Sequence, residues 1–86
     1  GRPRGKPAPP PPQPFPAVGT IWKAFPPSRG RFVMVVQINA DKQIGIRTAY
    51  KARDQWCLVL ASGLVWRDSR KFNGARRPGH YLYIEG

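Results

Sequence analysis

Basic residues that could bind phosphate are concentrated towards the C-terminal end of the chain. The basic residues of this segment, residues 67–77, are Arg67, Arg70, Lys71, Arg76 and Arg77, and the aromatic residues around them are Trp66, Phe72, Tyr81 and Tyr83. Guanidinium groups donate paired hydrogen bonds to phosphate oxygens, and aromatic rings stack on bases. Because so small a domain needs most of its rings in the core, we expect the basic side chains to make the contacts. The segment predicts a surface that binds nucleic-acid phosphates.

A second group of basic residues lies in and beside two predicted turns. Its members are Arg29, Arg31, Lys51 and Arg53, with Arg47 between them in the sequence. Whether they join residues 67–77 in one surface depends on the order of the strands, which the sequence does not reveal. We expect the four turn residues to extend that surface, and the N-terminal Arg2, Arg4 and Lys6 to add reach.

The net charge points to the same class of partner. Fifteen Lys and Arg residues stand against four acidic residues, which gives a formal charge of +11. Such a charge opposes compaction and attracts polyanions, of which nucleic acids are the commonest. An acidic protein or an anionic membrane surface is the competing partner, and solubility alone rarely requires so much charge of one sign. We therefore expect DNA or RNA as the partner.

The residue types offer less for catalysis. His80 is the only histidine, which excludes any mechanism that needs two. His80 or Glu85 could act as a general base, with arginines stabilising a transition-state phosphate, as in a compact toxin-like ribonuclease. Alternatively, His80 stands half exposed at the start of a strand and has no catalytic role. The acidic residues are too scattered for a metal site and no cofactor-binding motif is found, so we expect a non-enzymatic protein without metal or cofactor.

The segment of residues 31–39 is the one around which the other elements must be arranged. It is apolar and rich in β-branched residues, and it contains none of the Ala, Leu, Glu or Lys that favour helices. Alternation would put Val33, Val35 and Gln37 on one face. We predict a central β-strand that is covered on most of both faces.

Five further segments have the pattern of short strands. They are residues 18–25, 43–50, 55–60, 64–67 and 81–84, separated by turn-forming residues. Gly45 is expected to mark a bulge or bend, and residues 68–72 a short helical turn with Asp68 or Ser69 as its N-cap. About seventy residues are too few for an immunoglobulin sandwich. We predict an all-β fold, a small SH3-like barrel of five or six antiparallel strands, with an OB-like barrel as the alternative.

The chain divides into an N-terminal arm, residues 1–17, and a β-barrel domain, residues 18–86. The arm contains eight prolines and three basic residues, a composition typical of disordered, polyproline II segments. It could serve as a linker or basic arm, or as a docking peptide for an SH3 or WW domain. Because the chain begins with Gly1 rather than Met, the arm is compatible with a segment of a longer protein.

Cysteine usage and hydropathy bear on location. Cys57 is the only cysteine, so no intramolecular disulfide can form, and we expect a buried, unreactive thiol. No apolar run is long enough to span a bilayer, and no signal peptide is recognisable. We therefore expect a cytoplasmic protein without a membrane span.

Three short motifs cover much of the domain. They are VGTIWK at residues 18–23, RGRFVMV at residues 29–35, and RKFNG followed by GHY within residues 70–81. The motifs resemble small uncharacterised bacterial and phage domains that have a Gly-x-Val-Trp start, an Arg-Arg-x-Val-x-Val strand and an Arg-Phe…Gly-Tyr ending. The resemblance implies an SH3-like barrel of bacterial or phage origin. It supplies no catalytic residue, and the proline-rich arm lies outside it.

The functional expectation combines these observations. We expect non-enzymatic binding of nucleic acid, with low sequence specificity because phosphate contacts carry none directly. The alternative is a protein-interaction module that docks an acidic partner such as a polymerase or nuclease. The toxin-like ribonuclease is a third hypothesis.

Overall fold

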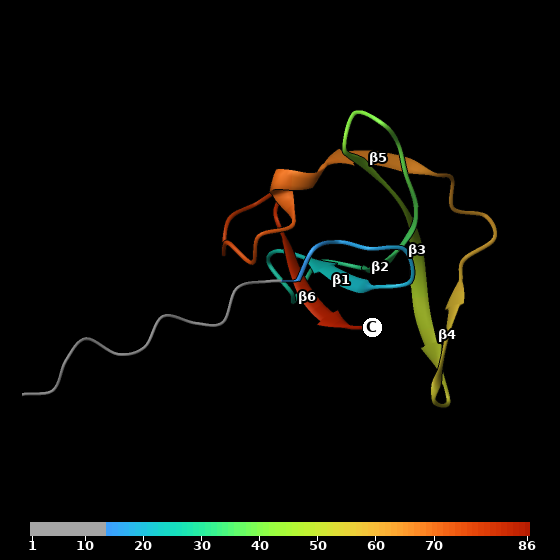
Figure 1. Ribbon diagram of the computed structural model, residues 1–86. Helices are drawn as coiled ribbons and strands as arrows, with labels where there is room; N and C mark the ends of the chain where they lie inside the picture. The colour runs from blue at the N-terminus through green and yellow to red at the C-terminus, as the bar shows by residue number, and fades with distance from the viewer. Residues whose placement is uncertain (1–13) are drawn as a thin grey trace, which may run out of the picture.

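A computed structural model of the protein describes residues 14–86 as one antiparallel β-sheet with a short 3₁₀ turn (Figure 1). The strands are β1 (Ile21–Ala24), β2 (Phe32–Ile38), β3 (Gln43–Ala52), β4 (Gln55–Leu58), β5 (Val65–Asp68) and β6 (Tyr81–Glu85), and the 3₁₀ turn η1 covers Ser69–Lys71. The prediction of an all-β fold with five or six antiparallel strands is confirmed. Most of the predicted proline-rich arm, residues 1–13, lies outside the described residues.

Strand β3 holds the sheet together, because it pairs with three other strands. The order is β4-β3-β2-β1-β6, with β5 paired to β3 off this path. β2 lies along one edge of β3, and β5 and β4 follow one another along the opposite edge. In Figure 1, β3 runs from β5 at the top to the β4 hairpin at the lower right. The predicted central position of residues 31–39 is confirmed, since β2 lies between β1 and β3.

The alternation along β2 is interrupted by a bulge. Val35 pairs with Ile46 whereas Gln37 pairs with Gly45, which leaves Val36 as the extra residue. Because paired residues share a face, the prediction that Gln37 lies on the face of Val35 is wrong. The irregularity expected at Gly45 is therefore real, but the extra residue belongs to the neighbouring strand.

Trp22 lies at the centre of the core and is fully buried. Its ring makes edge-to-face contacts with Phe72 and Tyr83, at centroid distances of 5.3 and 5.4 Å. Its indole N–H donates to Thr20 Oγ1 at 2.9 Å, which satisfies the one polar atom of the ring. Phe72 in turn stacks on Tyr81 at 4.6 Å. The expectation that most of the aromatic residues near the basic segment belong to the core is confirmed for Phe72 and Tyr81, which are buried.

Tight turns shorten the first strand relative to the prediction of residues 18–25. Gly19 has a φ of +95°, so the chain turns there and β1 begins only at Ile21. After β1, Gly30 N donates to Pro26 O at 2.9 Å and closes the turn that leads into β2. A Cβ atom at Gly30 would lie 2.0 Å from Ala24 O, so this close approach requires glycine. The turn brings the start of β2 against the end of β1.

Candidate functional site

Strand β5 and the turn η1 position the first basic residues of the predicted surface. Asp68 is the N-cap of η1, as predicted, and its side chain accepts a hydrogen bond from Arg70 N at 2.8 Å. The same carboxylate accepts bonds from Arg70 Nε at 3.1 Å and from Arg70 Nη2 at 2.9 Å. Hydrogen bonds from this guanidinium and backbone N–H lower the pKa of Asp68 to about 2, and the carboxylate raises the pKa of Arg70. The charge of Arg70 is therefore largely compensated, whereas Arg67 and Lys71 are exposed and have no ion pair in the described part of the chain.

The loop of residues 73–80 is held in shape by its own hydrogen bonds. Asn73 Oδ1 accepts from Ala75 N at 3.0 Å and lies 3.0 Å from His80 Nδ1. Gly74 N donates to Tyr81 O at 3.1 Å, which closes the base of the loop. The loop therefore displays Arg76 and Arg77, both exposed, from an ordered backbone.

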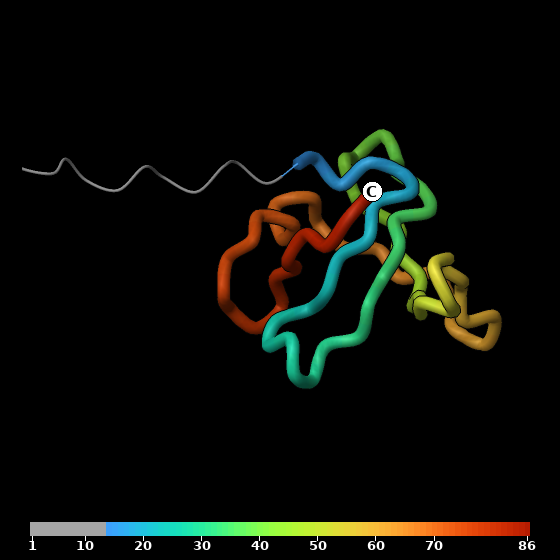
Figure 2. Tube along the Cα trace, turned by 90° about the horizontal axis from the view of Figure 1, so that it is seen from below, coloured from blue at the N-terminus to red at the C-terminus, as the bar shows by residue number. Residues whose placement is uncertain are grey.

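The turn before β2 lies beside this loop. Phe25 N donates to His80 O at 3.0 Å, and Figure 2 shows the two segments next to one another. Arg29, exposed in that turn, therefore belongs to the same side of the molecule as Arg76 and Arg77. Arg29, a member of the second basic group, therefore lies beside the basic residues of the segment 67–77.

A pocket of about 220 Å³ has arginines from two separate segments in its wall, one before β2 and one in β5. Its lining residues are Ala24, Arg31, Val33, Ile46, Thr48, Ser62, Gly63, Val65, Arg67 and Tyr81. Arg31 and Arg67 are both exposed. Both line the pocket because β3 pairs with β2 on one edge and with β5 on the other: Arg31 directly precedes β2, and Arg67 belongs to β5. Arg67 Nη1 donates to Trp66 O at 3.1 Å, and neither guanidinium group forms an ion pair within residues 14–86. A partly apolar cavity beside two such groups is suited to a ligand that combines a flat apolar body with negative charge.

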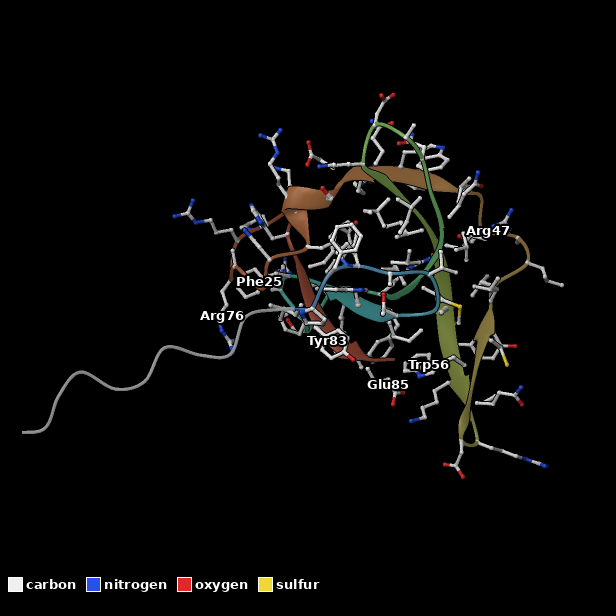
Figure 3. All side chains as sticks on the ribbon, in the orientation of Figure 1. Phe25, Arg47, Trp56, Arg76, Tyr83 and Glu85 are labelled. Atoms are coloured by element: carbon white, nitrogen blue, oxygen red, sulfur yellow. The ribbon has the colours of Figure 1, made fainter. Side chains whose placement is uncertain are left out.

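Lys51 and Arg53 do not line this pocket. Both are exposed on the β3–β4 hairpin, and Arg53 lies five residues, or about 16 Å, beyond the pocket residue Thr48 along β3. Lys51 Nζ is 3.4 Å from Glu85 Oε1 and 5.6 Å from the centre of the Trp56 ring. Arg47 donates to Ser62 O at 3.2 Å and lies on the opposite side of the molecule from Arg76 (Figure 3). The second basic group is thus divided by the fold.

Sequence reasoning missed the contacts that hold the β3–β4 hairpin against the rest of the sheet. Trp56 Nε1 donates to Glu85 Oε1, and the two side chains point toward one another from β4 and β6 (Figure 3). The Trp56 ring also packs edge-to-face on Phe32, at a centroid distance of 4.9 Å. The hydrogen bond from Trp56, with a smaller effect of Lys51, lowers the pKa of Glu85. Trp56 and Glu85 are 29 residues apart in the sequence, and no local pattern indicates that they form a hydrogen bond.

The two candidate general bases are separated by the length of β6. His80 precedes the strand and Glu85 ends it, so they stand about 16 Å apart along an extended chain. His80 contacts Asn73, and Glu85 is engaged with Trp56 and Lys51. Residues 14–86 contain no group of three or more His, Cys, Asp or Glu that could hold a metal ion. Cys57, expected to be buried, is half-buried.

Replacing Trp56 with phenylalanine should raise the pKa of Glu85 towards its ordinary value, because the hydrogen bond that stabilises the carboxylate is lost. A folded-state pKa below the unfolded value gives stability that is present above the unfolded value of about 4.3 and is lost as the pH falls through the folded value. The variant should therefore lose less stability than the wild type on acidification below about pH 4. Carboxyl NMR titration measures the pKa directly. Trp66→Phe is the matched control, and an unchanged Glu85 titration in Trp56→Phe would contradict the assignment.

Comparisons with known proteins assign this chain to no family. No protein-family model, no curated protein and no solved structure matches the chain. Within residues 14–86 there is no helix with the length and hydropathy that crossing a membrane would need.

Proposed function

We propose that this domain binds nucleic acid non-enzymatically, through phosphate contacts made by an exposed basic surface. The observation that carries the proposal is the proximity of exposed basic residues from separate segments: Arg31 and Arg67 line one pocket, and the turn that contains Arg29 is hydrogen-bonded to the loop of residues 73–80. The proposed contacts come from Arg29 and Arg31 before β2, Arg67 and Lys71 in and after β5, and Arg76 and Arg77 in the loop before β6. We call these six residues the basic end.

The basic end has charge available for a ligand. Two of the chain's four carboxylates form ion pairs within residues 14–86, and they engage Arg70 and Lys51, which are not among the six. Phosphate contacts by all six residues would give a slope of log affinity against log salt of roughly −4 to −5. Binding should therefore be strong at low salt and should fall steeply as salt is added.

We further propose that the curved sheet is an SH3-like barrel. The support is that β4 and β6, which stand at the two ends of the strand order, contact each other through Trp56 and Glu85. A flat sheet would hold these strands about 19 Å apart, so the sheet must curl strongly upon itself. The resemblance of the VGTIWK and RGRFVMV motifs to bacterial and phage domains supports the same fold and a microbial origin.

A salt titration tests the proposed function. The full chain is mixed with fluorescently labelled single-stranded and duplex DNA and RNA, and affinity is measured by anisotropy over a range of salt concentrations. A second protein with serine at Arg2, Arg4 and Lys6 separates the contribution of the arm. Salt-dependent binding that survives these replacements supports the proposal. The absence of binding to all four probes at low salt would overturn it.

A second candidate function, docking onto an acidic protein, is favoured by the β3–β4 hairpin. β4 pairs only with β3 among the described strands, so its outer edge can accept another strand. Nearby, Leu60 is 90% exposed and Tyr50 49% exposed. Saturable binding of one acidic protein, lost on Arg53→Asn and unaffected by changes at the basic end, would support this function. The ribonuclease hypothesis instead predicts RNA cleavage that His80→Ala abolishes.

A further inference from the structure

The pocket between Arg31 and Arg67 differs from the rest of the basic end, because it is concave and partly apolar. We propose that it takes one unstacked base of a single-stranded nucleic acid, while Arg31 and Arg67 hold the neighbouring phosphates. This inference rests on the proposed function and narrows it to single strands.

The size of the pocket suits one flat ring system. Its volume of about 220 Å³ lies below the roughly 300–1,000 Å³ of ordinary small-molecule sites. A complete dinucleotide or cofactor would therefore exceed it, whereas a single base would leave its sugar and phosphates outside. The guanidinium groups of Arg31 and Arg67 are exposed in the wall, where such phosphates would lie.

The lining combines apolar walls with a hydroxyl pair. Val65, which is 39% exposed, supplies aliphatic surface that a base can cover, and the buried core residues Val33 and Ile46 contribute smaller parts of the wall. Ser62 Oγ donates to Thr48 Oγ1 at 3.1 Å, so the Thr48 hydroxyl hydrogen can be donated to an acceptor on the edge of a base. Such contacts orient a base without reading its full identity, which is consistent with low sequence specificity.

Charge decides between a base and other apolar occupants. The residues that line the pocket include two arginines and no acidic residue. An uncharged apolar segment would leave both guanidinium groups without an anionic partner, whereas each nucleotide brings a phosphate. A base within a duplex is stacked and paired, and extruding it costs a few kcal/mol, so duplexes should contact the phosphate-binding arginines without entering the pocket.

Filling the pocket without changing the charge tests the inference. Gly63 lines the pocket, and a Cβ atom built there meets nothing within 4 Å, so Gly63→Phe can add a ring. Oligothymidine, oligouridine and a mixed-sequence duplex are the probes. We expect Gly63→Phe to weaken binding of both single strands by roughly 5- to 150-fold, the equivalent of one stacked base, and to leave duplex binding unchanged. Ala40→Phe, an exposed substitution in the β2–β3 turn, is the matched control.

A second filling variant guards against a local folding defect. Val65 is 39% exposed and lines the same pocket from β5, so Val65→Phe narrows it independently. Near-UV circular dichroism of both variants reports whether the fold is retained. The same selective loss for single strands in either folded variant supports the inference.

Removing charge separates the inference from the proposed function. The double variant Arg31→Ala, Arg67→Ala should weaken binding of single strands and duplex alike. The charge control is the double variant Lys51→Gln, Arg53→Asn on the β3–β4 hairpin, where the φ of 57° at residue 53 is one that asparagine tolerates. If the Arg31→Ala, Arg67→Ala variant weakens binding but neither filling variant does, the inference that the pocket binds a base is wrong, and the proposed function stands. If the wild type binds no nucleic acid but binds an acidic peptide with an apolar side chain, both are overturned.

Discussion

Replacing Trp22 with alanine is expected to destabilise the domain by about 3–5 kcal/mol. The side chain is fully buried, touches Phe72 and Tyr83 with its ring faces and edges, and donates to Thr20. Truncation removes all of these contacts and leaves a cavity that a sheet of short strands can fill only in part. Because domains are typically stable by only about 5–15 kcal/mol, the variant should be partly or wholly unfolded.

Denaturant unfolding followed by circular dichroism measures this effect. Leu60→Ala is the control, because the Leu60 side chain is 90% exposed and its removal should change the free energy of unfolding by less than about 0.5 kcal/mol. A loss of less than about 1 kcal/mol for Trp22→Ala would mean that the core is not centred on this residue.

The second large effect concerns the salt dependence of binding. Replacing Lys71, Arg76 and Arg77 with glutamine should reduce the slope of log affinity against log salt by about 2–3, since each lost phosphate contact removes about 0.7–0.9. All three side chains are exposed and none forms an ion pair within residues 14–86, so the substitutions should not affect folding.

The same salt titration measures this slope. A control protein loses the same number of charges elsewhere, through Arg47→Gln, Lys51→Gln and Arg53→Asn. Lys51 and Arg53, both expected in the interface, lie on the β3–β4 hairpin, and Arg47 lies on the opposite side of the molecule from Arg76. The control should keep the wild-type slope. An equal reduction of the slope in both proteins would indicate attraction by net charge alone. It would contradict the proposal that the basic end is the binding surface.

Local features of the fold could be predicted because they depend on neighbouring residues. Alternation and β-branched residues located all six strands, with boundaries that differ by a few residues at most, and Asp68 was one of the two residues predicted to cap the helical turn. The β2 bulge was not predicted correctly. An extra residue in one strand is defined only by the partner strand, and the sequence of β2 contains no mark of it.

Composition and local patterns were enough to predict an all-β, strongly basic chain with arginines gathered in residues 67–77. Which basic residues lie together depends on the tertiary structure. Arg31 and Arg67 line one pocket because β3 pairs with both β2 and β5, whereas Asp68 compensates the charge of Arg70, and Lys51 and Arg53 lie on the β3–β4 hairpin. Strand pairing joins residues far apart in the chain, and this is the information that local patterns lack.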